Sequence, residues 1–289
     1  MTDFLQLAFS GLTVGAVYAL VAVGFVAIFT VSEVINLAQG EFAALSGLVA
    51  ISAVASGLPL VAALALAVVS VGIVAVLMER LTIAPVKRMT TLTSIILTLG
   101  VSTALKALML LVWGPNSRGL TPFPGQDFTV LGVSIRAQEL WILGITAVVA
   151  VALIWFYERT GWGKALKACA EQPTAARLVG ISLARASMLS FLIAGVTGAV
   201  AGVAASPIYF SSWEAGLAMG LKGFVAAALG GLVSIRGALL GGLSLGVLES
   251  LVAGYVDTGL RDAVAFVVLI ILLVVRPGGV FGRHAEARV

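Results

Sequence analysis

Three ionisable side chains interrupt the long apolar stretches of this sequence and are the first candidates for chemistry. Lys106, Lys222 and Glu249 each stand in a run made otherwise mainly of aliphatic residues and glycine. Ionisable groups in hydrocarbon cost about 3 kcal/mol by insertion measurements, so they are rare and usually functional. At about 1.5 Å of rise per residue, all three lie roughly 8–10 Å below the same predicted membrane surface. We expect Glu249 to pair with Lys222 or Lys106, closing or lining a pathway; snorkelling of each lysine to the interface is the alternative.

A second polar group falls in a short break between the first two apolar runs. It consists of Asn36, Gln39 and Glu41. Asn36 and Gln39 stand three residues apart, as the two members of a helix capping box do. Polar groups at membrane depth can also line a pathway, because irregular backbone there has to be buried in protein or face water. The two interpretations are compatible with one another.

The chain offers little material for catalysis. His284 is its one histidine and Cys169 its one cysteine, which argues against a histidine metal cluster and a disulfide framework. Gly163-Lys164-Ala165 is the nearest approach to a phosphate-binding P-loop, but it lacks the first glycine and the hydroxyl residue of that motif. We therefore expect no catalytic residue, no metal and no cofactor. If ATP is used, another chain hydrolyses it.

The composition identifies the elements that must position these residues. The chain is 61% hydrophobic and 10% charged, with a mean hydropathy of +1.15, whereas soluble domains are about 45–50% apolar and about 25% charged. The apolar runs are continuous and about 18–25 residues long, the length at which a helix crosses a bilayer. We therefore predict an all-α, polytopic transmembrane helical bundle, a single domain over residues 1–289 in contact with lipid. The net charge of +4 is no nucleic-acid signal, because the basic residues flank the spans.

We count eight or nine spans and expect a broken or re-entrant helix either near residues 32–41 or in the glycine-rich stretch near 217–242. No internal duplication is visible in the sequence, and rows such as Gly11/Gly15 and Gly242/Gly246 predict close helix packing. The predicted spans are 4–30, 36–56, 58–79, 91–113, 139–157, 187–206, 217–234, 237–255 and 261–276.

The distribution of Lys and Arg predicts the orientation, because cytoplasmic loops carry an excess of both. One set of loops holds twelve of these residues and the opposite set holds three, so the first set is predicted to be cytoplasmic. The amino terminus lies outside in this topology, and its lack of a basic n-region predicts a retained first span. The cytoplasmic set comprises Arg80, Lys87, Arg88, Arg159, Lys164, Lys167, Arg177, Arg185, Arg236, Arg276, Arg283 and Arg288; the opposite set comprises Arg118, Arg136 and Arg261.

Two loops exceed hairpin length, an outer one at about 114–138 and a cytoplasmic one at about 158–187. In the cytoplasmic loop, Pro173 suits the first turn of a helix and Gly180 suits the left-handed position after its end. We predict a helix over Thr174–Val179 that presents Ala175, Ala176, Leu178 and Val179 to a groove on a soluble partner. Any loop of this length contains some helix, which is the plainer interpretation.

A resemblance favours the docking interpretation. The run Ala168–Glu171, followed by Ala175-Ala176 and Gly180-Ile181, is similar to the EAA loop of bacterial ABC importer permeases, where it forms the coupling helix that contacts the ATPase. The segments at 15–20, 34–42, 220–231 and 237–242 resemble the branched-chain amino-acid permease family along nearly the whole chain. Gln39 stands where the family usually has a histidine, which leaves the solute more open.

The resemblance implies a permease subunit of a bacterial inner-membrane importer that works by alternating access. Its implied partners are two cytoplasmic ATPases, a periplasmic substrate-binding protein and a second, homologous or identical permease. Urea, short amides or other amino acids are alternative solutes. A channel, an ion-coupled secondary transporter and an intramembrane enzyme are the competing classes. The implied coupling residues are Glu171, Pro173, Ala175, Ala176, Arg177 and Gly180.

Overall fold

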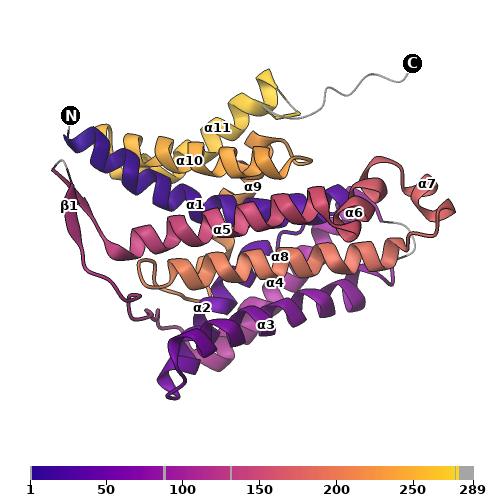
Figure 1. The fold of residues 1–289 in the computed structure, drawn as a ribbon, viewed down its shortest axis with the longest axis horizontal. Coiled ribbons are helices and arrows are strands. Elements are labelled where there is room, and N and C mark those ends of the chain that lie inside the picture. Colours follow the sequence, from indigo (N-terminus) through magenta and orange to yellow (C-terminus); the bar gives the residue numbers. More distant parts are fainter. Residues whose placement is uncertain (1, 87–88, 131, 277, 280–289) are drawn as a thin grey trace.

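The computed structural model describes residues 2–86, 89–130, 132–276 and 278–279, and it is a bundle of helices that run side by side (Figure 1). All nine predicted apolar runs form helices. Seven helices are long and apolar enough to cross a membrane, while α2 and α9 are shorter. The nine helices are α1 (Thr2–Ser32), α2 (Gln39–Ala55), α3 (Leu60–Met78), α4 (Thr91–Trp113), α5 (Ala137–Arg159), α8 (Leu183–Ala205), α9 (Ala215–Gly230), α10 (Ile235–Tyr255) and α11 (Arg261–Val275).

Short elements mark the two ends of the bundle. Strands β1 (Phe128–Val130) and β2 (Val133–Ile135) form an antiparallel hairpin in the predicted outer loop. Gln6 near the start of α1 makes two hydrogen bonds to the backbone of Ser134, so the amino terminus lies at this end, which we call the hairpin end. Helices α6 (Gly161–Glu171) and α7 (Pro173–Leu178) lie at the other end (Figure 1), as the predicted topology of the two loops requires. A π-helical turn, η1 (Glu79–Ile83), extends α3, and a 3-10 turn, η2 (Thr258–Leu260), precedes α11.

Helix α1 forms the centre of the bundle. In its most apolar stretch 89% of the residues are buried, compared with 11% in the last span. Glycines allow α10 to approach it closely: a Cβ atom built on Gly15 would lie 2.7 Å from the carbonyl oxygen of Gly242. Helices associate in lipid through such backbone contacts, because lipid tails provide no hydrophobic drive between spans. Much of the surface of α3, α4, α5 and α11 is left to face lipid.

Helices α2 and α9 both begin in the middle of the bundle. Gln39, the first residue of α2, donates a hydrogen bond to the carbonyl of Ala194, which is the central residue of α8. From there α2 runs to the hairpin end. Helix α9 begins beside α2, where a Cβ atom built on Gly40 would lie 1.9 Å from the carbonyl oxygen of Gly216, and it runs in the opposite direction. The two elements that the sequence left uncertain are therefore half-length helices whose amino-terminal ends meet.

The order of helices repeats with inverted direction. Helices α1–α4 form a long, a half-length and two long helices, and α8–α11 follow the same order while running the opposite way. The packing repeats as well: α1 lies along α10 as α8 lies along α3, and α1 contacts α9 as α8 contacts α2. This arrangement is an inverted-topology repeat, typical of transporters, with binding sites near the repeat interface. Helix α5 stands between the two halves.

Candidate transport site and coupling helices

Glu249 of α10 is the centre of a buried charged cluster. Its side chain is fully buried, and its Oε2 accepts hydrogen bonds from the hydroxyl of Tyr18 at 2.9 Å and from Nζ of Lys222 at 3.1 Å. Nζ of Lys222 also lies 2.7 Å from a carboxylate oxygen of Asp262, and Nε of Arg261 lies 3.7 Å from Oε2 of Glu249. The cluster joins α1, α9, α10 and α11.

This cluster confirms one of the two predicted pairings, that of Glu249 with Lys222. Two cations, Lys222 and Arg261, balance two anions, Glu249 and Asp262. A buried ion pair becomes tolerable when further hydrogen bonds satisfy its remaining atoms. Glu249 is only partly satisfied, because its Oε1 has no hydrogen-bond partner among the described residues. Arg261 entered the sequence argument only as a basic residue of the outer set, and Asp262 was not considered, although an acid next to a base at the start of the last span was a visible signal.

Lys106 belongs to a different cluster, around Glu41. Oε1 of Glu41 accepts a hydrogen bond from the hydroxyl of Ser102 at 3.0 Å and lies 3.8 Å from Nζ of Lys106. Ser102 and Lys106 are one turn apart on α4, so they approach the carboxylate together. Glu41 is fully buried in the first turn of α2, where the helix dipole favours a negative charge. The predicted alternative pairing of Lys106 with Glu249 is wrong, because Glu41 in the first turn of α2 supplies a nearer carboxylate.

Asn36 and Gln39 do not form the predicted capping box. The side-chain oxygen of Asn36 accepts from the backbone N–H of Ala38 at 3.1 Å, which is an Asx turn, and Gln39 bonds to α8 instead. The non-helical backbone before α2 takes its other partners from Thr98, whose hydroxyl bonds to the backbone of Ile35 and Leu37. Backbone groups of a non-helical segment in the middle of the bundle need hydrogen-bond partners, and the short side chain of Asn36 supplies one by accepting from the N–H of Ala38.

Three orphaned polar atoms remain around the start of α2. They are Nδ2 of Asn36, Oε1 of Gln39 and Oε2 of Glu41, none of which has a hydrogen-bond partner within the described part of the chain. All three side chains are fully buried. Oε2 of Glu41 faces the first turn of α9, since a Cβ atom on Gly216 would lie 2.2 Å from it. One donor and two acceptors therefore lie unused where the two half-length helices meet.

The cytoplasmic loop forms two capped helices rather than one. The hydroxyl of Thr160 accepts from the N–H of Gly163 and caps α6, a helix that the sequence analysis did not predict. Pro173 is the first residue of α7, which lies one residue earlier than predicted. Gly180 has φ +85°, and its N–H and that of Ile181 close the helix by bonding to Arg177 and Ala176. Ser182 then caps α8 by accepting from the N–H of Arg185.

The exposed face of α7 differs from the predicted one at a single residue. Ala176 is buried in a cluster with Tyr157, Leu166, Cys169 and Ala186, so it anchors α7 and the prediction that it faces a partner is wrong. Contact between α6 and α7 covers it. The exposed tip carries Leu178, which is 85% exposed, and Val179, which is 75% exposed. The other predicted coupling residues, all exposed, are Glu171, Pro173, Ala175, Arg177 and Gly180.

The basic residues of the predicted cytoplasmic set gather around the same end of the bundle. Arg159 ends α5, and Lys164 and Lys167 belong to α6. Arg236 lies in the first turn of α10 and pairs with Glu158 of α5. Five residues of the sequence argument lie outside the described residues: Lys87, Arg88, Arg283, His284 and Arg288.

Known proteins resemble this chain in fold or in sequence. A solved chain titled "PsaBC from Streptococcus pneumoniae in complex with Fab" has a TM-score of 0.54 and 13% identity, covering 95% of this chain and 92% of its own, which shows a shared fold. LivH of Escherichia coli K12, a high-affinity branched-chain amino acid transport system permease protein, is 33% identical over 99% of this chain and 98% of its own length. BraD of Pseudomonas aeruginosa, which bears the same description, is 32% identical over 99% of this chain and 98% of its own length. A family model described as "Branched-chain amino acid transport system / permease component" matches residues 7–273. The chain therefore belongs to the branched-chain amino acid transport system permease family.

Proposed function

We propose that this chain is the permease subunit of an ATP-driven importer of branched-chain amino acids. The similarity to LivH carries the proposal, because it extends over 99% of the chain and includes both the membrane helices and the segment of α6 and α7. The proposed assembly adds two cytoplasmic ATPases, which bind and hydrolyse ATP, and a periplasmic substrate-binding protein. A second permease, homologous or identical, completes it in the bacterial inner membrane.

The proposed orientation places the hairpin end outside and α6 and α7 in the cytoplasm. The excess of exposed basic residues around α6 and α7 supports it, since positive charge marks the cytoplasmic side. The amino terminus of α1 is then outside, and α11 ends on the cytoplasmic side. In this orientation the exposed tip of α7 is available to a soluble ATPase.

Helix α7 is built to transmit movement. Leu178 and Val179 offer apolar surface, and Arg177 beside them offers a cation, on a helix that is capped at its carboxyl end. Ala176 fixes α7 to α6, and Gly180–Ser182 connects it directly to α8. Because α8 lies along α1, α2 and α3, a displacement of α7 by the ATPases would reach the centre of the bundle. Packed helices shift between discrete arrangements, which is the element that alternating access needs.

The pathway is proposed to pass the start of α2. An amino acid carries an ammonium group, a carboxylate and, in this class, an aliphatic side chain. The two free acceptors, on Gln39 and Glu41, suit the ammonium group, and the free amide donor of Asn36 suits the carboxylate. The ion pairs of Glu249 with Lys222 and of Glu41 with Lys106 would open or rearrange as the solute passes. In the observed arrangement both carboxylates are fully buried, which fits a closed pathway.

Transport by the assembled complex tests the proposal. The chain, its co-purified ATPases and second permease would be reconstituted in liposomes with the binding protein, and uptake of radiolabelled leucine, urea and acetamide would be measured with and without ATP. ATP-dependent leucine uptake is expected, with no uptake by complexes that carry a catalytically inactive ATPase. Uptake of urea or acetamide but not leucine would replace the proposed solute, and uptake independent of ATP would contradict the importer class.

A further inference from the structure

Glu79 is a buried acid that the transport proposal does not use. It is 2% exposed and stands where α3 passes into the π-helical turn η1, at the end of the bundle that holds α6 and α7, which we call the α6–α7 end. Its Oε2 has no hydrogen-bond partner in the part of the chain that the structure describes. The carboxyl end of a helix carries a partial negative charge, so α3 itself does not stabilise a carboxylate there. A buried carboxylate is costly unless a cation and hydrogen bonds compensate it, so Glu79 indicates a partner that joins it in another arrangement of the helices.

The inverted repeat relates Glu79 to Glu249. Helix α3 lies along α8 as α10 lies along α1, and α3 and α10 each carry a glycine seven residues before the acid, Gly72 and Gly242. Gly72 faces α8 and Gly242 faces α1, because a Cβ atom built on either glycine would contact that helix. The same spacing on helices of opposite direction places Glu249 toward the hairpin end and Glu79 at the α6–α7 end. Two buried acids therefore occupy equivalent positions in the two halves.

The two acids differ in what surrounds them. Glu249 accepts hydrogen bonds from Tyr18 and Lys222. Among the described residues, Glu79 has one cation within ion-pair distance, Arg80, whose Nε lies 3.9 Å from Oε2 and whose side chain is 54% exposed. The observed arrangement is therefore paired toward the hairpin end and largely unpaired at the α6–α7 end. Alternating access needs such a difference, because one half of the pathway closes as the other opens.

Arg185 is the cation placed to complete the pair. It lies in the first turn of α8, seven residues before Leu192, and seven residues are about two helical turns, so both residues belong to one face of α8. Leu192 packs on α3, since a Cβ atom built on Gly72 would lie 3.2 Å from its Cδ1. Helices α3 and α8 run in opposite directions. Seven residues back along α8 and seven residues on along α3 therefore bring Arg185 and Glu79 to the same level. Arg185 is exposed, and it forms no ion pair within the described residues.

The contact between η1 and α8 links this position to the coupling helix. Nη2 of Arg80 donates a hydrogen bond to Sδ of Met188 at 3.5 Å, which holds η1 beside the first turns of α8. Helix α7 is joined to α8 by residues 179–182 alone, so a displacement of α7 moves Arg185 before the rest of α8. Single π-helical turns are frequent at functional sites, and η1 presents Glu79 from such a turn.

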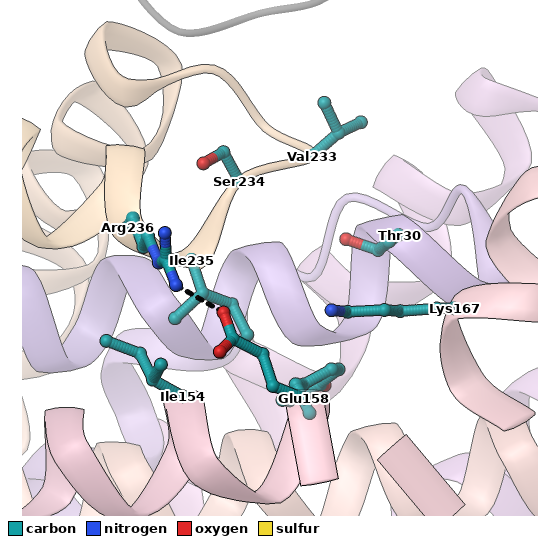
Figure 2. Close-up of a pocket in the computed structure, with 9 residues that line it drawn as sticks. Thr30, Ile154, Glu158, Lys167, Val233, Ser234, Ile235 and Arg236 are labelled. Atoms are coloured by element: carbon teal, nitrogen blue, oxygen red, sulfur yellow. Dashed lines mark hydrogen bonds and ion pairs between the residues drawn. The ribbon is translucent and has the colours of Figure 1, made fainter. Parts of the chain in front are cut away.

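An ion pair elsewhere at the same end has a different character. Figure 2 shows Arg236 of α10 paired with Glu158 of α5, and their side chains are 67% and 42% exposed. Water screens an exposed pair, so it contributes little to the stability of either arrangement. The carboxylate of Glu79 is buried, so gaining or losing a cation there changes the relative free energies of two helix arrangements.

We propose that Glu79 is the cytoplasmic counterpart of Glu249 and that Arg185 pairs with it when ATP binding displaces α7. The pair closes the α6–α7 end of the pathway while the cluster around Glu249 loosens. Glu79 acts through the position of the helices and does not contact the solute, so it is a positioning residue. The inference rests on the proposed importer function.

Disulfide cross-linking in the reconstituted complex tests the pairing. Cys169→Ala removes the native thiol, and Glu79→Cys together with Arg185→Cys supplies a new pair. A catalytically inactive ATPase that still binds ATP holds the complex in its ATP-bound arrangement. The yield of the intramolecular disulfide should be severalfold higher with ATP than without nucleotide. The two single-cysteine variants are the controls and should give no such product.

Charge removal separates positioning from a structural role. Glu79→Gln and Arg185→Gln should each lower ATP-dependent leucine uptake about tenfold, the size of one hydrogen bond to a charged group. The double variant should lose no more than either single variant, because both remove the same pair. The unfolding temperature of Glu79→Gln in detergent should be at or above that of the wild type, since its pair with Arg185 is not formed in the observed arrangement. Glu33→Gln, which neutralises an exposed acid directly after α1, is the matched control.

Each readout has an outcome that would overturn the inference. Equal disulfide yields with and without ATP would remove the nucleotide-driven pairing. A lower unfolding temperature for Glu79→Gln would make Glu79 a structural residue, and additive losses of uptake in the double variant would show that the two residues act separately. Normal uptake by Glu79→Gln would overturn this inference alone, whereas a wild-type complex without ATP-dependent uptake would overturn the proposed function as well.

Discussion

Lys222 holds its ammonium nitrogen 3.1 Å from the buried carboxylate of Glu249, and the same nitrogen lies 2.7 Å from the exposed carboxylate of Asp262. One lysine thereby connects α9 to two neighbouring helices, α10 and α11. A cation shared between a buried and an exposed acid can keep one partner while it leaves the other. This makes Lys222 the residue around which we expect α9 to move relative to α10 and α11.

Glu249→Gln should destabilise the chain and abolish transport. Removing one partner of a buried ion pair typically costs about 3–5 kcal/mol, because the other charge is left uncompensated; Asp262 beside Lys222 should reduce that cost here. Thermal unfolding in detergent and leucine uptake by the reconstituted complex are the measurements. Glu214→Gln, which neutralises an exposed acid before α9, is the control. Unchanged stability and transport in Glu249→Gln would contradict the role of this cluster.

The two buried carboxylates should differ in how strongly they couple to their lysines. Glu249 lies 3.1 Å from Lys222, whose side chain is 13% exposed, whereas Glu41 lies 3.8 Å from Lys106, whose side chain is 22% exposed. Double-mutant cycles with Gln for Glu and Met for Lys, read by free energies of unfolding, should give a coupling energy at least twofold larger for Glu249 with Lys222. A larger coupling for Glu41 with Lys106 would contradict the assignment of Glu249 with Lys222 as the stronger ion pair.

Gly216→Ala should disrupt the junction of the two half-length helices. The added Cβ would lie 2.2 Å from the carboxylate of Glu41 and 3.0 Å from its Cα. The Glu41 side chain could move away, but the clash with its Cα can be relieved only if the backbones of α2 and α9 separate. Gly144→Ala in α5 is the matched control, because a Cβ there meets nothing within 4 Å and alanine is the better helix former by about 1 kcal/mol. Yield of folded protein after size-exclusion chromatography compares the two. Equal yields would show that the backbones are not in close contact.

Leu178→Ser and Arg177→Glu should leave the unfolding temperature unchanged and reduce association with the ATPases. Both side chains are exposed at the tip of α7, so no intramolecular contact is lost. Ala176→Leu should instead destabilise the chain, because Ala176 is 3% exposed in a packed cluster. Parallel thermal unfolding and co-purification of the three variants separate the two effects. A large loss of stability in Leu178→Ser would place that residue in the fold rather than at an interface.

Cys169 should react slowly with maleimides. This residue of α6 is fully buried where α6 packs against α7. Burial raises the pKa of its thiol, so less thiolate is present at neutral pH and labelling begins only at higher pH. In a Cys169→Ala background, Leu178→Cys should label rapidly. Mass spectrometry of labelled protein between pH 6.5 and 9 measures both. Rapid labelling of Cys169 at pH 7 would contradict the packing of α7 against α6.

The long spans could be predicted from the sequence because length and hydropathy decide them almost alone. The run 91–113 coincides with α4, and Pro173 and Gly180 place α7 within one residue. Prolines and glycines act locally, through a fixed φ and a left-handed φ, so their effect does not depend on distant partners. Helix boundaries that local chemistry sets could therefore be predicted from the sequence.

Features that depend on contacts between residues far apart in the sequence could not be predicted in this way. The sequence located a break near Glu41, but not that its carboxylate would meet Lys106 of α4, because that contact joins residues 65 positions apart. The inverted repeat was also hidden, since it relates helix order and direction rather than residue identity. Ala176 was predicted to face a partner because the separate helix α6 that covers it had not been predicted.

The central claim is that this chain works with ATPases that dock on α7, and affinity purification tests it most directly. Tagged wild-type chain and the Leu178→Ser variant are extracted from the native host in mild detergent and their co-purifying proteins are identified by mass spectrometry. Two soluble ATPase subunits and a permease partner are predicted with the wild type, and a marked loss of the ATPases with the variant. If the wild-type chain is recovered alone, under conditions that keep a control ABC importer intact, the importer account is contradicted and a channel or ion-coupled carrier takes its place.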